Sequence, residues 1–176
     1  EPMWARPSAR LHRIRESLRQ ELWRDALSQT RDFLAAAPDH ELAGEARLLE
    51  GLLYLKVQPA KAAPILTRVA RGGAPGLRSR AAYLLGAAAV SLRNCSWLSE
   101  DLPDRSPAAP DRWQQAGAVW SAACDDLKGD PDAASTKYRS VAEASFDTPL
   151  KAYALTALGE RQARQGLAAS LIGARV

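Results

Sequence analysis

Apolar residues recur at helical spacing along almost the whole chain, and this period limits the fold more than any other feature. The first run places Leu11, Ile14 and Leu18 on one face, and the second extends from Trp23 to Leu34. Further runs predict helices at about 42–55, 60–71, 78–94, 111–128, 131–145 and 149–165, with a short last helix from Leu167. Because period-2 alternation is nearly absent, the sequence predicts an all-α fold of roughly eight or nine helices.

The composition agrees with this fold class. Ala and Leu, both strong helix formers, dominate the 47% of hydrophobic residues, whereas β-branched and aromatic residues are sparse. A chain of 176 residues buries about 70% of its unfolded surface as one domain, so we expect a single domain over residues 1–176. The longest nearly apolar run, Ala81 to Leu92, is far shorter than the ~20 residues of a membrane span, and it predicts a buried helix.

Prolines and short polar residues mark the expected helix ends. Asp130 and Thr148 each precede a proline that suits the first turn of a helix, so both are expected to cap helices, and Asp39 is a third expected cap. The run of residues 72–75, Gly-Gly-Ala-Pro, should end the helix before it. The connections are short, which predicts that consecutive helices pack antiparallel.

A recurring glycine relates the helix pairs to one another. Gly51 and Gly86 lie 35 residues apart in similar apolar strings, and Gly159 follows 73 residues later, which is about two more units. Two helices that cross closely leave no room for a side chain at their contact. We therefore expect Gly51 and Gly86 to be packing sites.

With these glycines the chain resembles the tetratricopeptide-repeat family. The unit of that family, about 34 residues long, is a helix hairpin with a Leu-Gly pair and an aromatic in its first helix, small residues in its second helix and a closing proline. The most similar unit, about residues 44–77, matches at Gly51, Tyr54, Ala63, Ala70 and Pro75. It departs from the pattern at Glu50, where the family has leucine.

The other units match less of the pattern. The unit at about residues 7–40 is partial and keeps Ala26, Phe33 and Pro38. Units at about 79–112, 114–147 and 149–176 are degenerate, and Pro103, Pro107 and Pro110 interrupt the first of these. The resemblance implies a right-handed α-solenoid of antiparallel helix pairs with an irregular proline-rich interruption, while a generic helical solenoid or an irregular bundle stays open.

In that family the first helices of successive units line a groove that holds a segment of a partner protein. The resemblance implies a groove face made of Arg15, Leu48, Leu52, Leu55, Arg80, Tyr83 and Val90. This mixed apolar and basic surface would suit an acidic or amphipathic segment. The leucines are equally consistent with core residues if the array closes its own groove. Trp97, in the interruption, either covers the place of the missing helix, which we favour, or is an exposed anchor for the partner.

Charge is divided unevenly along the chain. Residues 51–99 contain no acid and seven basic residues, namely Lys56, Lys61, Arg68, Arg71, Arg78, Arg80 and Arg93. Residues 100–147 contain ten acids and five basic residues. A solvated outer face explains the basic stretch better than a nucleic-acid footprint, because its charges are spread among buried leucines, and an acidic protein partner fits equally well.

No group of residues indicates catalysis. His12 and His40 lack the spacing of metal ligands or of a catalytic base, and the glycines after Arg71 lack the Gly-Lys-Ser/Thr ending of a phosphate loop. The aspartates within residues 125–132 lack the pattern of a cation loop and read as helix ends and caps. We predict a non-enzymatic scaffold or accessory subunit without metal, cofactor or small-molecule ligand. The alternatives are a peptide-binding chaperone or adaptor with an open groove, and a nucleic-acid-binding helical repeat.

Cys95 and Cys124 are too few for a disulfide framework or a zinc site. Each is expected near the end of a first helix, so their sulfurs would meet if those helices lie side by side, but two small buried hydrophobes are as consistent. A bridge would contribute on the order of 3 kcal/mol in the chain-entropy model and would indicate an oxidising compartment. Because the chain also starts at Glu1 instead of an initiator Met, we expect an exported, periplasmic bacterial protein, with the cytoplasm as the alternative.

Overall fold

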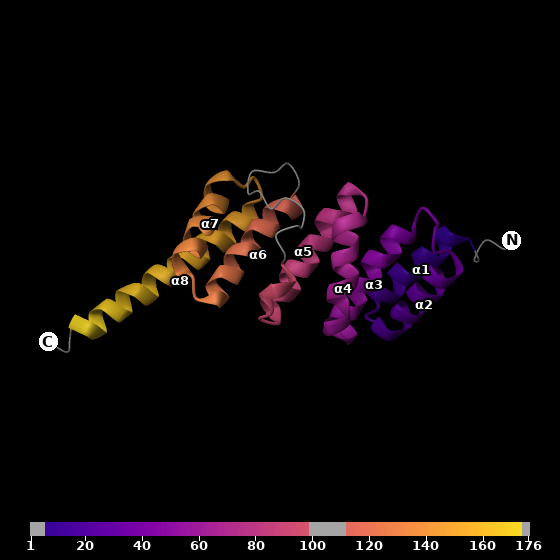
Figure 1. Ribbon diagram of the computed structural model, residues 1–176, viewed down its shortest axis with the longest axis horizontal. Helices are drawn as coiled ribbons and strands as arrows, with labels where there is room; N and C mark the ends of the chain where they lie inside the picture. Colours follow the sequence, from indigo (N-terminus) through magenta and orange to yellow (C-terminus); the bar gives the residue numbers. More distant parts are fainter. Residues whose placement is uncertain (1–5, 99–111, 174–176) are drawn as a thin grey trace. The chain divides into compact units, whose positions relative to one another are not determined.

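The computed structural model describes the backbone of residues 6–98 and 112–173, and the side chains as far as residue 166. The described residues form helices without a strand, which confirms the predicted all-α fold class (Figure 1). The helices are α1 (Pro7–Arg19), α2 (Trp23–Ala36), α3 (Ala43–Val57), α4 (Pro59–Gly72), α5 (Pro75–Ser91), the short 3-10 helix η2 (Cys95–Trp97), α6 (Arg112–Lys128), α7 (Pro131–Ala144) and α8 (Thr148–Gly173). Among them, none has both the length and the apolar character that crossing a membrane requires.

The chain divides into two compact units, Glu1–Pro103 and Asp104–Val176. The first unit holds α1 to α5 and η2, and the second holds α6 to α8. The predicted proline-rich interruption falls mainly on residues 99–111, which lie outside the described residues. The single domain over residues 1–176 stays a prediction.

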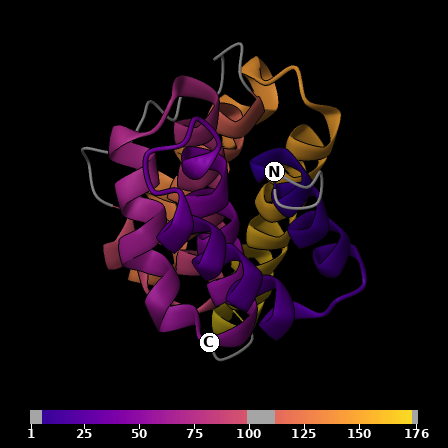
Figure 2. The same ribbon diagram turned by 90° about the vertical axis from the view of Figure 1, so that its right-hand side faces the viewer.

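In the first unit each helix packs against the next one along the chain, and α3 also contacts α5. Both views show α1 and α2 side by side (Figures 1 and 2). One core cluster, between α1, α2 and α3, is built on Ile14 and Phe33. The other, between α3, α4 and α5, is built on Leu66 and Leu85. Each helix thus buries residues toward its sequence neighbours, as expected for consecutive antiparallel hairpins.

In the second unit α6 packs against α7, and α7 packs against α8. Its fully buried side chains include Val119 on α6, Val141 on α7 and Ala154 on α8. Gln115 is also fully buried, and its Oε1 atom accepts a hydrogen bond from the Ser145 hydroxyl. This bond satisfies two buried polar groups at once and ties the start of α6 to the end of α7.

Gly51 has the packing role that its recurrence predicts. A Cβ atom on Gly51 would lie 2.5 Å from Cδ2 of Leu66 and 2.7 Å from its Cγ, so α3 and α4 approach too closely there for any side chain. Gly86 is buried in α5. Gly159, which continues the glycine spacing, has no such role, because it is exposed and a Cβ there would meet nothing within 4 Å. The similarity of the last unit is therefore one of sequence spacing and not of packing.

One of the three predicted helix caps is present where we expected it. Asp130 caps α7, since its Oδ1 atom accepts a hydrogen bond of 3.0 Å from the Ala133 amide. The prediction for Thr148 is wrong by one residue: α8 begins at Thr148, and Asp147 accepts the capping bond from the Leu150 amide at 3.2 Å. Both caps add a carboxylate to the positive end of a helix.

The cap expected at Asp39 is wrong. No side chain caps α3, and the turn before it is closed by the Nδ1 atom of His40, which accepts a hydrogen bond of 3.1 Å from the Leu42 amide. Two helix boundaries also differ from the prediction. Pro75 starts α5 and does not only end α4, and α8 continues through Gly166 without a separate helix from Leu167. A single glycine costs about 1 kcal/mol in a helix and need not end it.

Candidate protein-interaction surfaces

The predicted groove residues lie on α1, α3 and α5, and their burial differs. Leu48 is 3% exposed and belongs to the core between α3, α4 and α5, so of the two places that the sequence left open for it, groove or core, the structure shows the core. Leu52 is half-buried. Leu55 is half-buried as well and packs against the edge of the same core. On α3 the apolar part of the candidate surface is therefore limited to the exposed edges of Leu52 and Leu55.

The α5 residues of this surface are more exposed. Arg80 is exposed, while Tyr83 and Val90 are half-buried. Arg80 and Tyr83 lie three residues apart and so share one face of α5. The helix that carries Leu52 and Leu55, α3, is in contact with α5.

Arg15 is on α1 but is not an isolated charge. Its guanidinium forms an ion pair with Glu45 on α3, and the Arg15 side chain is 46% exposed. A half-exposed pair of this kind contributes little to stability, about 0–1 kcal/mol. The pair does neutralise the charge of Arg15, so Arg15 would attract an acidic partner less strongly than an unpaired arginine at this position.

The other basic residues of the acid-free stretch do not form one patch. The Lys56 ammonium lies 5.6 Å from the centre of the Trp23 ring, and the Lys61 ammonium lies 5.9 Å from that of Tyr54. Arg78 donates a hydrogen bond of 3.3 Å from Nε to the Ala70 carbonyl near the end of α4. These cations are held by contacts within the first unit, which sequence inspection did not anticipate.

Sequence inspection also missed a hollow between α4 and η2. Its volume is about 740 Å³, and its lining consists of Ala63, Pro64, Thr67, Arg68, Arg71, Gly72, Ser96 and Trp97. Trp97 is half-buried and packs against the core between α3, α4 and α5 while its outer part borders the hollow. The spacing of Arg68 and Arg71, one turn apart on a helix, was the only signal in the sequence. The position of Trp97 beside them depends on how η2 packs, which no local pattern reveals.

The surroundings of Glu50 explain why a carboxylate is accepted at the position where the repeat pattern has leucine. Burial raises the pKa of the Glu50 carboxyl, and the nearby guanidinium groups of Arg31, Arg47 and Arg68 oppose this shift. The carboxylate is thus tolerated in a half-buried position because three cations surround it. Glu50, on α3, is thus an acidic neighbour of Arg68.

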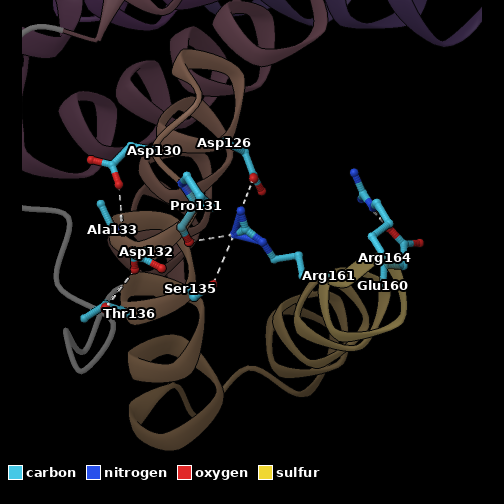
Figure 3. A network of polar contacts seen from close by, with 10 residues as sticks. All are labelled: Asp126, Asp130, Pro131, Asp132, Ala133, Ser135, Thr136, Glu160, Arg161 and Arg164. Atoms are coloured by element: carbon cyan, nitrogen blue, oxygen red, sulfur yellow. Dashed lines mark hydrogen bonds and ion pairs between the residues drawn. The ribbon is translucent and has the colours of Figure 1, made fainter. Parts of the chain in front are cut away.

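Among the aspartates of residues 125–132, Asp130 is the predicted helix cap, whereas Asp125 and Asp126 form ion pairs that were not predicted. Asp125 forms an ion pair of 2.5 Å with Lys137, and Asp126 forms one with Arg161 on α8. Figure 3 shows Arg161 extending from α8 to the first turn of α7, where it donates hydrogen bonds to the Pro131 carbonyl at 3.2 Å and the Ser135 hydroxyl at 3.3 Å. No group of three or more His, Cys, Asp or Glu side chains is placed to hold a metal ion in the described parts of the chain.

The two histidines have different environments. His12 is exposed on α1. His40 accepts a hydrogen bond from the Leu42 amide and lies edge-on to the Phe33 ring, with the ring centres 6.2 Å apart.

In the second unit the buried Tyr138 has a raised pKa, caused first by burial and next by Tyr153. A phenol with a raised pKa stays neutral at physiological pH, consistent with a core residue.

Cys95 and Cys124 lie in different units. Cys95 begins η2 and is half-buried, whereas Cys124 is 3% exposed within α6. The predicted disulfide would therefore link the two units, and it stays a prediction. We expect no free thiol per chain when native protein is denatured without reductant, and two after reduction. Two free thiols without reductant would refute the bridge and remove the main reason to expect an exported protein.

Comparison with protein-family models, curated proteins and solved structures found no match to this chain. The resemblance to tetratricopeptide repeats thus rests on the residues alone and stays a prediction.

Proposed function

We propose that the protein is a non-enzymatic scaffold or accessory subunit, and that α1 to α5 form a right-handed solenoid of tetratricopeptide-like hairpins. The observation that carries this proposal is the contact between α3 and α5, in addition to the contacts of each helix with the next. This pattern is expected when the first helices of successive hairpins lie side by side. Such helices present one continuous surface to a partner.

The proposed partner is a protein with an acidic or amphipathic segment. On the proposed surface, Arg80 would attract acidic groups, and Tyr83 and Leu52 would contribute apolar contact. Tyr and Arg are among the residues that dominate the binding energy of protein interfaces. Charge contributes mainly to the rate and specificity of association, so the apolar contacts would supply most of the affinity.

A scaffold is favoured over the two alternatives. A peptide-binding chaperone requires a deep open groove, whereas Leu48 is part of the core and Leu55 packs against it. A nucleic-acid-binding repeat requires cations aligned along a track of phosphates, whereas Lys56, Lys61 and Arg78 contact groups of their own unit. An exported location also remains part of the proposal and depends on the disulfide.

The double substitution Arg80→Glu with Tyr83→Ala tests the proposed surface. We expect at least about a thirtyfold loss of affinity for the native partner, because losing an interface hot spot costs about 2 kcal/mol or more. The partner is obtained by affinity purification from the native source, and binding is then compared by titration. Circular dichroism should show unchanged helicity.

Arg139→Glu is the matched control, since Arg139 is an exposed arginine on α7 in the second unit. It makes the same change of charge as Arg80→Glu and should leave the affinity unchanged. If the complex withstands the double substitution, or if Arg139→Glu weakens it equally, the surface on α3 and α5 is not the binding site.

A further inference from the structure

We propose that α8 pairs with α8 of a second copy of this chain, and that the two helices cross in antiparallel directions at Gly159. The pairing uses the outer face of α8, which consists of Ala152, Leu155, Thr156, Gly159, Ala163 and Gly166. This face belongs to the second unit, so the proposal goes beyond the proposed function and does not depend on Arg80 or Tyr83.

The outer face of α8 is exposed although none of its residues is charged. Its residues recur every three or four positions, about half a turn away from Ala154, which is fully buried in the second unit. Leu155 is 59% exposed, and the Thr156 hydroxyl donates a hydrogen bond of 2.9 Å to the Ala152 carbonyl of its own helix. A helix face that meets only water usually carries charged residues. The outer face therefore has the composition of a face that packs.

The second half of α8 extends beyond the helix on which α8 packs. Arg161 already reaches the first turn of α7, where its guanidinium contacts the Pro131 carbonyl. The side chains of residues 162–166 are exposed, and the helix continues to Gly173 (Figure 1). A helical segment of about a dozen residues is only marginally stable in water unless another element packs on it. This second half is thus an independent indication that α8 has a partner.

A second α8 supplies what each half of the helix lacks. Gly159 divides α8 into two parts that each have about three turns or more. When two copies cross at Gly159 in antiparallel directions, the second half of each α8 lies along the outer face of the first half of the other. A two-fold axis makes this exchange mutual. The matching lengths favour a second copy over a helix of a different protein.

The residues on the two sides of Gly159 are also complementary in size. Leu155 and Ala163 are equally far from Gly159, so the antiparallel crossing places Leu155 of each copy opposite Ala163 of the other. Ala152 and Gly166 form a second such pair, and both are small. The glycine of the same recurrence in α3, Gly51, shows that such a position accepts a leucine of a packed helix, because Leu66 of α4 lies over it. Large residues thus meet small ones along the whole crossing.

The charges of α8 do not oppose the pairing. Glu160 is next to the crossing point on the flank of the outer face, and it forms an ion pair of 3.6 Å with Arg164 of its own helix. Arg161 points to the other side of α8 and is paired with Asp126. Identical faces can therefore meet without unpaired like charges at the two-fold axis.

Charged substitutions at Leu155 and Ala163 of the full chain test the pairing by sedimentation equilibrium. We expect the original chain to be a dimer at micromolar concentration. Leu155→Glu with Ala163→Glu places like charges opposite each other and should weaken the dimer at least about a hundredfold. Leu155→Glu with Ala163→Lys places opposite charges there instead. At about 50 mM salt, where charges are weakly screened, this variant should pair at least about tenfold more tightly than the first.

Three further variants locate the effect. Leu92→Glu makes the same change at a leucine of the first unit that is 46% exposed, and it should leave the dimer unchanged. Gly159→Leu favours the helix within one chain but adds a side chain at the crossing, so it should weaken the dimer at least about tenfold without loss of helicity. The variant at Arg80 and Tyr83 should dimerise normally, which distinguishes failure of the surface on α3 and α5 from failure of this one.

Five results would overturn the proposal. An original chain that stays monomeric would leave the outer face to a helix of another protein. A dimer that withstands the two glutamates, or that Leu92→Glu weakens equally, would have its contact elsewhere. Equal weakening by the Glu–Glu and Glu–Lys variants would exclude the antiparallel crossing at Gly159. A dimer that exists only as a disulfide-linked species on a non-reducing gel would be explained by the cysteines.

Discussion

Replacing Gly51 by leucine should lower the free energy of unfolding by about 3 kcal/mol, the upper part of the range for an overpacked core. The first atom of the new side chain would already lie 2.5 Å from Cδ2 of Leu66. Leu66 is 0% exposed, so it has no free space into which it can turn. Either α3 and α4 separate or Leu66 adopts a strained rotamer, and both outcomes cost packing energy. Urea denaturation followed by circular dichroism measures the change.

Gly159→Leu is the control for this substitution. Gly159 is also a helical glycine, but a Cβ there would meet nothing within 4 Å. The gain in helix propensity should therefore raise the stability of α8 by up to about 1 kcal/mol. If Gly51→Leu were also stabilising, the close approach of α3 and α4 would be refuted. Gly86→Leu is expected to behave like Gly51→Leu, because Gly86 is buried in α5.

The positions of the helices could be predicted from the sequence because apolar spacing directly reflects which face is covered. α4 and α7 agree closely with the predicted ranges, since a proline at the first turn fixes where each begins. The end of α8 could not be predicted in the same way. Gly166 lowers helix propensity by a small amount, and neighbouring residues in a long helix offset this cost, so the helix continues to Gly173.

The candidate surfaces were less predictable than the helices. Leu48, Leu52 and Leu55 all recur at helical spacing, yet only Leu48 is buried. α3 contacts three helices, α2, α4 and α5, and the sequence of α3 alone does not indicate which of its residues face each of them. The hollow beside Trp97 was missed for the same reason, because it is formed by residues about 30 positions apart along the chain.

The second large effect is expected at Arg161, where substitution by alanine should destabilise the second unit by about 2–4 kcal/mol. The Arg161 side chain is only 11% exposed and connects α8 with three groups: Asp126, the Pro131 carbonyl and the Ser135 hydroxyl. Hydrogen bonds of a charged group contribute about 1.5–3 kcal/mol each at most, and the gain is reduced by the cost of burying the guanidinium. Thermal and urea unfolding of the variant measure the loss.

Arg164→Ala is the matched control, because Arg164 lies one turn further along α8 and its side chain is 75% exposed. It forms an ion pair with Glu160, at 3.6 Å within the same helix, and such exposed pairs contribute about 0.3–0.5 kcal/mol. The large difference between two neighbouring arginines would come from burial, since their chemistry is the same. Equal effects at Arg161 and Arg164 would refute the network that Figure 3 shows.

A double-mutant cycle separates the ion pair from the rest of this network. Asp126→Asn should cost less than Arg161→Ala, because Asp126 is 38% exposed and can be rehydrated, whereas removing Arg161 leaves the Pro131 carbonyl and the Ser135 hydroxyl without this donor. The coupling energy between the two substitutions should be about 1 kcal/mol and should decrease at high salt. Hydrogen exchange gives the structural counterpart. In the Arg161 variant, protection of backbone amides from exchange should fall first in the part of α8 after Leu158. Residues 162–166 are exposed there, and Arg161 holds this part of α8 to the start of α7.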